Sequence, residues 1–127
     1  MTQHGGLATL GPFDFRFTRD EVNAYRNALG FPGGEDVPIT FFTRALTEPH
    51  VLAELRKVFG NQIPIHIEQS FDVTEVLRPE TRYTFTLVME ALRDSRMRLT
   101  GTFARPSNET CVVMRSEFLL AQLAAMR

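Results

Sequence analysis

The feature that most constrains the fold of this chain is a change in hydrophobic period after residue 60. Before it, a helix is predicted from about Glu48 to Phe59, with Thr47 as its cap, Pro49 in the first turn and Gly60 as terminator. After it, residues 65–74, 83–89 and 96–105 alternate with the period of two that is typical of half-buried strands, and residues 110–120 are apolar enough for a central strand. Strands joined by turns form an antiparallel sheet, and the apolar stripe of the helix must be buried against it. An α+β fold with a sheet wrapped around one helix is therefore predicted.

The N-terminal part predicts one further strand and one further helix. Phe13, Phe15 and Phe17 alternate with polar residues, which indicates a strand. The segment Thr18-Arg19-Asp20-Glu21 is a capping box, so a helix should follow, with Val22, Tyr25 and Leu29 on one face and its end near Gly30. Residues 31–38 are rich in glycine, proline and acidic residues, and are predicted to form a loop at the rim of a pocket.

Composition narrows the class of protein. A chain of 127 residues with 43% hydrophobic residues suits one domain, residues 1–127, with a substantial core. A net charge of -1 gives no reason to expect nucleic acid as a partner. The lone Cys111 lies in a strand-like setting and favours a reducing compartment. Because the chain shows neither a signal-peptide pattern nor an apolar run of roughly 18 residues, we expect a soluble, cytoplasmic protein without a membrane partner.

Three segments, in this order, carry a family resemblance: residues 17–30, the run Val37-Pro38-Ile39-Thr40-Phe41, and His66-Ile67-Glu68-Gln69-Ser70-Phe71 followed by Arg78-Pro79. Over residues 15–120 the chain resembles the MaoC-like hydratase/dehydratase superfamily. In particular it is similar to the N-terminal, non-catalytic-type half of fatty-acid-synthase-like dehydratases. That family commonly has glycine and aspartate after the arginine-proline pair, where this chain has Glu80-Thr81.

The resemblance implies a hot-dog fold that pairs into a double hot dog, either as a homodimer or as a heterodimer with a catalytic hot-dog subunit. It also implies binding of an acyl chain carried as a thioester on coenzyme A or acyl carrier protein. Coenzyme A or phosphopantetheine would then be part of the substrate, and no separate cofactor or metal is expected. Active members are lyases of lipid metabolism that interconvert trans-2-enoyl and (R)-3-hydroxyacyl thioesters.

The active members use an Asp-x4-His pair to position water and shuttle its proton. In this chain Ala45 stands five residues before His50, and Asn61 stands five residues before His66. An asparagine side chain cannot take a proton from water, and the residues between His66 and Arg78 alternate with a period of two, where an active hydratase would need a long helix. His66 and Asn61 are therefore weak catalytic candidates, and the resemblance implies no complete dyad.

Candidate binding residues come from the same segments. Arg44, Phe41 and His66 are candidates for contacts with the acyl thioester, although ion pairing with an acidic residue is the preferred interpretation of Arg44. His66 is predicted to share a strand face with Glu68, Ser70 and Asp72. A further basic cluster of Arg93, Arg96 and Arg98 is predicted to be either a solvated hairpin end or a patch that anchors phosphate.

Three functions are left open. The first is an accessory subunit of an (R)-specific enoyl-CoA hydratase or 3-hydroxyacyl dehydratase. The second is a hot-dog acyl-CoA thioesterase in which Glu68 or Glu48 activates water. The third is a non-enzymatic acyl-CoA binder.

Overall fold

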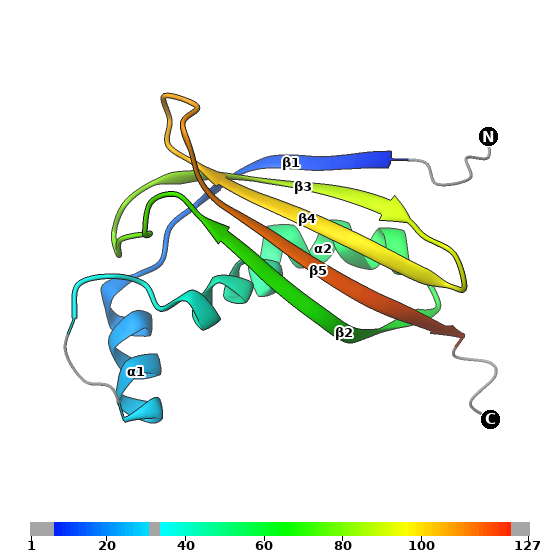
Figure 1. Cartoon of the computed structure of the whole chain (residues 1–127), viewed down its shortest axis with the longest axis horizontal. Helices are drawn as coiled ribbons and strands as arrows, with labels where there is room; N and C mark the ends of the chain where they lie inside the picture. Colours follow the sequence, from blue (N-terminus) through cyan, green and yellow to red (C-terminus); the bar gives the residue numbers. More distant parts are fainter. Residues whose placement is uncertain (1–6, 31–33, 123–127) are drawn as a thin grey trace.

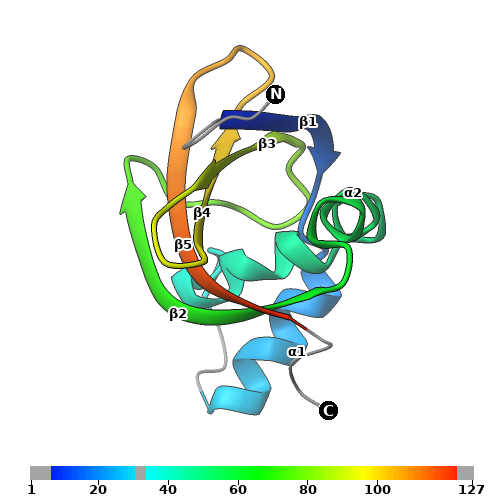
Figure 2. The same ribbon diagram turned by 90° about the vertical axis from the view of Figure 1, so that its right-hand side faces the viewer.

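The fold is an antiparallel sheet that curls around two consecutive helical segments. The computed structural model describes residues 7–30 and 34–122, so residues 31–33 of the predicted loop lie outside the described residues. The elements are β1 (Leu7–Phe15), α1 (Arg19–Leu29), the 3-10 helix η1 (Ile39–Thr47), α2 (Pro49–Phe59), β2 (Gln62–Val73), β3 (Tyr83–Ala91), β4 (Arg96–Ala104) and β5 (Thr110–Gln122). The five strands are ordered β1-β3-β4-β5-β2, and each neighbouring pair is antiparallel. Figures 1 and 2 show the sheet wrapped over η1 and α2, which confirms the predicted α+β architecture.

Phenylalanine side chains fill the space between the sheet and the helices. Phe17, Phe42, Phe85 and Phe103 are fully buried, and the ring centroids of Phe85 and Phe103 lie 4.6 Å apart. The sheet residue beneath them is Gly101, where an added Cβ would stand 2.8 Å from Cε1 of Phe85. The close approach of the Phe85 ring to β4 therefore depends on the missing side chain at residue 101.

Helix α1 begins and ends as predicted but lies outside the curl of the sheet (Figure 1). The Thr18 hydroxyl accepts from the Glu21 amide, the Glu21 carboxylate accepts from the Thr18 amide, and Gly30 is left-handed. Of the predicted apolar face only Val22 is buried, whereas Leu29 is 49% exposed. Helix α1 is thus held by few apolar contacts.

The start of α2 differs from the prediction. Residues 39–47, to which no element was assigned, form η1, and α2 follows with Glu48 as its N-cap. Thr47 does not cap α2, because it is still part of η1 and its hydroxyl donates to the Arg44 carbonyl at 2.8 Å. The predicted end of the helix at Gly60 is confirmed, since the Gly60 amide donates to the Arg56 carbonyl.

The predicted face of His66 is wrong. In the pairing of β2 with β5, His66 lies opposite Phe118 and Glu68 lies opposite Glu117, so Ile67 is an extra residue. Such a β-bulge shifts the alternation of side chains by one residue. His66 therefore shares the inner face of the sheet with Phe118, whereas Glu68, Ser70 and Asp72 point to the outer face.

The part of the chain that the structure describes contains no helix with the length and hydrophobicity needed to cross a membrane.

Candidate functional site

A polar group interrupts the apolar inner face of the sheet where β2 meets β5. Ser116 is only 1% exposed and is the one buried polar side chain found among residues 7–30 and 34–121. Its hydroxyl donates to Oε1 of Gln69 at 2.6 Å, and Nε2 of Gln69 donates to the Arg115 carbonyl at 2.9 Å. Both side chains therefore have their hydrogen bonds satisfied, which is the condition for placing polar groups in an apolar layer.

His66 stands beside this pair on the same face of β2. Its ring stacks on Phe118, with centroids 5.0 Å apart and planes inclined by 28°. Its Nε2 lies 3.0 Å from the Glu68 carbonyl oxygen, which can only accept, so Nε2 donates this hydrogen bond. Within the described residues no carboxylate makes an ion pair with His66, because the Glu68 side chain is on the other face of the sheet.

Asn61 is not brought to His66. It precedes the first residue of β2, and the strand from Gln62 to His66 is extended. At about 3.3 Å per residue, those four steps alone span roughly 13 Å. The extended strand thus holds Asn61 and His66 apart.

Arg44 and Phe41 are engaged with α1 rather than with β2. Arg44 donates from Nε to Glu21 at 2.9 Å and from Nη1 to Glu48 at 3.1 Å, so the ion-pairing interpretation is confirmed. Phe41 stacks on Tyr25 with centroids 4.3 Å apart. Their predicted contacts with an acyl thioester remain a prediction, and neither residue is placed next to His66 by a described contact.

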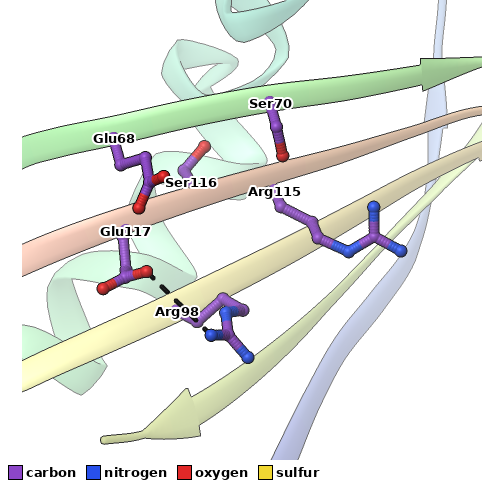
Figure 3. Close-up of a pocket in the computed structure, with 6 residues that line it drawn as sticks. All are labelled: Glu68, Ser70, Arg98, Arg115, Ser116 and Glu117. Atoms are coloured by element: carbon purple, nitrogen blue, oxygen red, sulfur yellow. Dashed lines mark ion pairs between the residues drawn. The ribbon is translucent and has the colours of Figure 1, made fainter.

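A charged pocket lies on the outer face of the sheet, away from the helices (Figure 3). It encloses about 200 Å³ and is lined by Glu68, Ser70, Arg98, Arg115, Ser116 and Glu117. Arg98 lies 3.2 Å from Glu90 and 4.0 Å from Glu117, and Arg96 lies 3.5 Å from the same Glu117. Two members of the predicted basic cluster are thus neutralised by carboxylates, which favours a solvated ion-pair network over a phosphate-anchoring patch.

Cys111 is buried in β5, as predicted for a strand-core thiol. Burial raises the pKa of the Cys111 thiol above its usual range, and the nearby Arg105 side chain opposes that change only in part. Residues 7–30 and 34–122 include no grouping of three His, Cys, Asp or Glu side chains that could hold a metal ion.

The Gln69–Ser116 pair was missed in the sequence. A polar Ser116 two residues from Met114 and two from Phe118 is the pattern that could have revealed it, because in a strand these three residues share one face. A serine at an inward position of an otherwise apolar strand needs a hydrogen-bond partner nearby.

Comparison with known proteins shows the fold. No family model and no curated protein sequence matches the chain. Among solved structures it is similar to the C-terminally truncated HadBC (3R-hydroxyacyl-ACP dehydratase) complex from Mycobacterium tuberculosis, at 11% identity, a TM-score of 0.68 and coverage of 91% of this chain and 96% of that one.

Two other solved structures are similar over nearly the whole chain. The fluoroacetyl-CoA thioesterase FlK is 11% identical, with a TM-score of 0.69 and coverage of 99% of this chain and 93% of that chain. A hot-dog-like protein from Thermanaerovibrio acidaminovorans is 10% identical, with a TM-score of 0.67 and coverage of 97% and 86%. The chain therefore has a hot-dog fold, and dehydratases and thioesterases both occur among the proteins that share it.

Proposed function

We propose that this chain is an acyl-thioester-binding hot-dog subunit, acting as the non-catalytic or accessory part of an (R)-specific enoyl-CoA hydratase or 3-hydroxyacyl dehydratase of acyl metabolism. The observation that carries the proposal is the setting of His66, which lies on the inner face of the sheet and makes no ion pair with a carboxylate among the described residues. A histidine without an acid or base beside it can bind or orient a group, yet it provides only half of the chemistry of hydration.

The free edge of β2 supports a partner chain. In the part of the chain that the structure describes, β2 pairs only with β5, which leaves the backbone groups of its other edge unpaired. Ile65 and Ile67 beside that edge are 46% and 44% exposed. An exposed apolar edge strand is a template for pairing with another strand. A second hot-dog chain paired there would bring its own side chains close to His66 and Phe118, and would extend the sheet into a double hot dog.

In this proposal, the identity of the partner determines whether the assembly can hydrate an enoyl thioester or only bind it. In a homodimer neither chain supplies an Asp-x4-His pair, so the assembly would bind acyl thioesters without hydrating them. In a heterodimer the partner supplies the pair, and this chain forms one wall of the acyl-binding site. We place the assembly in the cytoplasm, because Cys111 is a buried cysteine without a disulfide partner, which is typical of proteins in a reducing compartment.

The test is co-purification followed by an activity assay. The chain alone, and mixed with candidate hot-dog partners that contain Asp-x4-His, would be separated by size exclusion and each peak assayed for hydration of crotonyl-CoA. We expect activity only in a mixed peak, lost when the partner's histidine is changed and retained at reduced level in His66→Ala. Hydration by the isolated chain that disappears in His66→Ala would contradict the accessory role.

A thioesterase is the second candidate, and the likeness to the fluoroacetyl-CoA thioesterase favours it. The two carboxylates considered for activating water are placed differently. Glu48 is the N-cap of α2 beneath the sheet, whereas Glu68 lies on the outer face. A thioesterase reaction would therefore depend on Glu48, and release of coenzyme A from acyl-CoA should be abolished by Glu48→Gln and unaffected by Glu68→Gln.

A further inference from the structure

The inner faces of β2 and β5 carry their side chains in rows, and one of these rows is polar. The opposite residues of the two strands on this face are Pro64 and Leu120, His66 and Phe118, Gln69 and Ser116, Phe71 and Met114, and Val73 and Val112. Every row except that of Gln69 and Ser116 contains an apolar residue. We call Gln69 and Ser116 the polar row. It separates the apolar surface next to His66 from the apolar surface next to Phe71.

The side of the polar row that faces Phe71 is already filled. The Phe71 ring packs edge-on against Phe42, with centroids 5.7 Å apart and planes inclined by 80°. Phe42 is fully buried and its centroid lies 5.9 Å from that of Phe103, while Met114 is 1% exposed. Because protein interiors are close-packed, a ligand could enter this part only by displacing the rings.

The side of the polar row that faces His66 has free surface. His66 is exposed, and Phe118 and Leu120 are apolar side chains that are only partly buried against the core. An alkyl group laid on this surface can be buried in one direction only, since β5 ends two residues after Leu120. That direction leads from His66 toward the polar row.

Hydrogen bonds hold the polar row in place. Oε1 of Gln69 accepts from Ser116 at 2.6 Å, and Nε2 donates to the carbonyl oxygens of Arg115 at 2.9 Å and Ser70 at 3.3 Å. The Gln69 amide is therefore fixed in orientation, and the side chain is only partly buried. An alkyl chain that covered this amide would exclude water from it and would offer no hydrogen bond in return, which is unfavourable.

We propose that the polar row is the end of the acyl-binding surface and restricts the ligand to short acyl groups of about butyryl length. The inference rests on the proposed acyl-thioester function and names its substrate class. Side chains on one face of a strand recur every two residues, so roughly 7 Å along β5 separate Phe118 from Ser116. A butyryl group whose thioester lies at His66 fits this length, whereas an octanoyl group must cross the polar row. Gln69 determines the specificity, and Ser116 is the residue that positions it.

The test is a series of ligands that differ only in acyl length. Acetyl-, butyryl-, hexanoyl- and octanoyl-pantetheine would each be titrated into the full chain by calorimetry. We expect the affinity to rise about fourfold for each methylene group from acetyl to butyryl, the usual gain for burying a methylene. Hexanoyl-pantetheine should bind no more tightly than butyryl-pantetheine, and octanoyl-pantetheine should bind more weakly.

The double variant Gln69→Met with Ser116→Ala tests whether the polar row sets this limit. Both hydrogen-bonding partners are replaced together, so neither is left buried without a partner, and methionine is a flexible apolar side chain of similar length to glutamine. We expect octanoyl-pantetheine to bind at least about tenfold more tightly to the double variant than to the unchanged chain, because the penalty for covering a polar group is removed. The affinity for butyryl-pantetheine should change less than about threefold.

Ser70→Ala is the matched control, because Ser70 is a serine of the same strand on the outer face (Figure 3). It should leave the dependence of affinity on acyl length unchanged. Melting temperatures of the variants would be measured in parallel. The series on the unchanged chain needs no variant, so it decides the proposal even where the double variant does not fold.

Two results would overturn the proposal. The first is an affinity of the unchanged chain that continues to rise up to octanoyl-pantetheine. The second is the same dependence on acyl length in the folded double variant, which would mean that the polar row serves only the pairing of β2 with β5. In either case the acyl-thioester function itself stands, whereas a failure of all four pantetheine thioesters to bind would contradict that function.

Discussion

At the scale of single residues, Cys111 shows how burial sets the chemistry of a side chain. Burial raises the pKa of the Cys111 thiol, and the hydrogen bond with Arg105 lowers it to a smaller extent. Because the thiolate is the reactive species, we expect iodoacetamide to alkylate the native chain roughly tenfold or more slowly than the chain in denaturant. Equal rates of alkylation, followed by mass spectrometry, would contradict this assignment.

The raised pKa also predicts how stability depends on pH. The folded state favours the protonated thiol, so its contribution is fully present below the unfolded pKa of about 8.5 and is lost as the pH rises through the folded value. The free energy of unfolding would be measured between neutral and alkaline pH for the unchanged chain and for Cys111→Ala. We expect the unchanged chain to lose stability relative to Cys111→Ala as the pH increases, whereas a constant difference would show an unshifted thiol.

Ser116→Ala tests the buried polar pair. Removing the hydroxyl takes away the 2.6 Å hydrogen bond to Gln69, and we expect a loss of about 1 kcal/mol in the free energy of unfolding. Ser70→Ala is the matched control, because Ser70 is an exposed serine on the outer face of β2. The free energy of unfolding of both variants would be measured in urea. Equal losses would mean that the buried hydrogen bond of Ser116 contributes no more to stability than the exposed Ser70 hydroxyl.

The residues of the candidate site could be predicted only in part. His66 was singled out correctly as a strand residue, but its face could not be read from the sequence, since Ile67 continues the apolar-polar alternation without a break. The bulge is created by pairing with β5, more than forty residues later in the chain. Long-range pairing of this kind leaves no local sequence pattern behind it.

At the scale of elements, helix α1 is joined to the rest of the chain by polar contacts, one of them through Glu21, and by the stacking of Tyr25 on Phe41. One carboxylate oxygen of Glu21 caps the helix at the Thr18 amide, and the other accepts from Arg44 of η1 at 2.9 Å. With Val22 as its only buried residue, α1 has little apolar area to hold it in place. We therefore expect α1 to have the fastest amide exchange among the helices of the described residues.

Thr18→Ala removes the cap and should lower the free energy of unfolding by about 1 kcal/mol, with faster amide exchange confined to α1. Thr47→Ala is the control, because Thr47 was expected to cap α2 and does not, so its removal should cost less than about 0.5 kcal/mol. If Thr47→Ala is the more destabilising change, the start of α2 has been assigned wrongly.

Gly101→Ala tests the contact of the core with β4. An added Cβ would lie 2.8 Å from the Phe85 ring and 3.3 Å from Cε of Met114, both of them buried, so the packing must shift. We expect a loss of about 1 to 3 kcal/mol in the free energy of unfolding, the usual cost of overpacking a core. Thr100→Ala, next along β4 on the outer face, should cost less, and thermal unfolding of the two variants compares them.

The order of the elements could be predicted because each has its own local pattern, and η1 was the exception. Its N-cap is Pro38, which makes no side-chain hydrogen bond, and its residues include β-branched and aromatic side chains that do not favour a helix. What holds η1 is the burial of Phe42 and Ala45 beneath the sheet, a tertiary effect. Helical segments that depend on packing lack the start and stop residues by which they could be recognised.

At the scale of the whole molecule, the two edges of the sheet are expected to behave differently. The proposed pairing uses the edge of β2, so Ile67→Lys should convert a dimer into a monomer when the mass is measured by light scattering at micromolar concentration. Leu7→Lys is the control on the opposite edge strand, where Leu7 is 68% exposed, and it should leave the mass unchanged. A monomeric unchanged chain, or dissociation only in Leu7→Lys, would contradict pairing through β2.

The extra residue in β2 also bears on how such a chain can change over generations. Because Ile67 has no counterpart in β5, loss of its codon would leave His66 opposite Phe118 and Glu68 opposite Glu117, with each side chain on its present face. A one-codon deletion in the regular part of β2 between Glu68 and Val73 would instead move the side chains on one side of the deletion to the opposite face of the sheet. Within this strand, position 67 is therefore a place where an amino acid can be gained or lost during evolution without moving the other side chains between the inner and the outer face of the sheet.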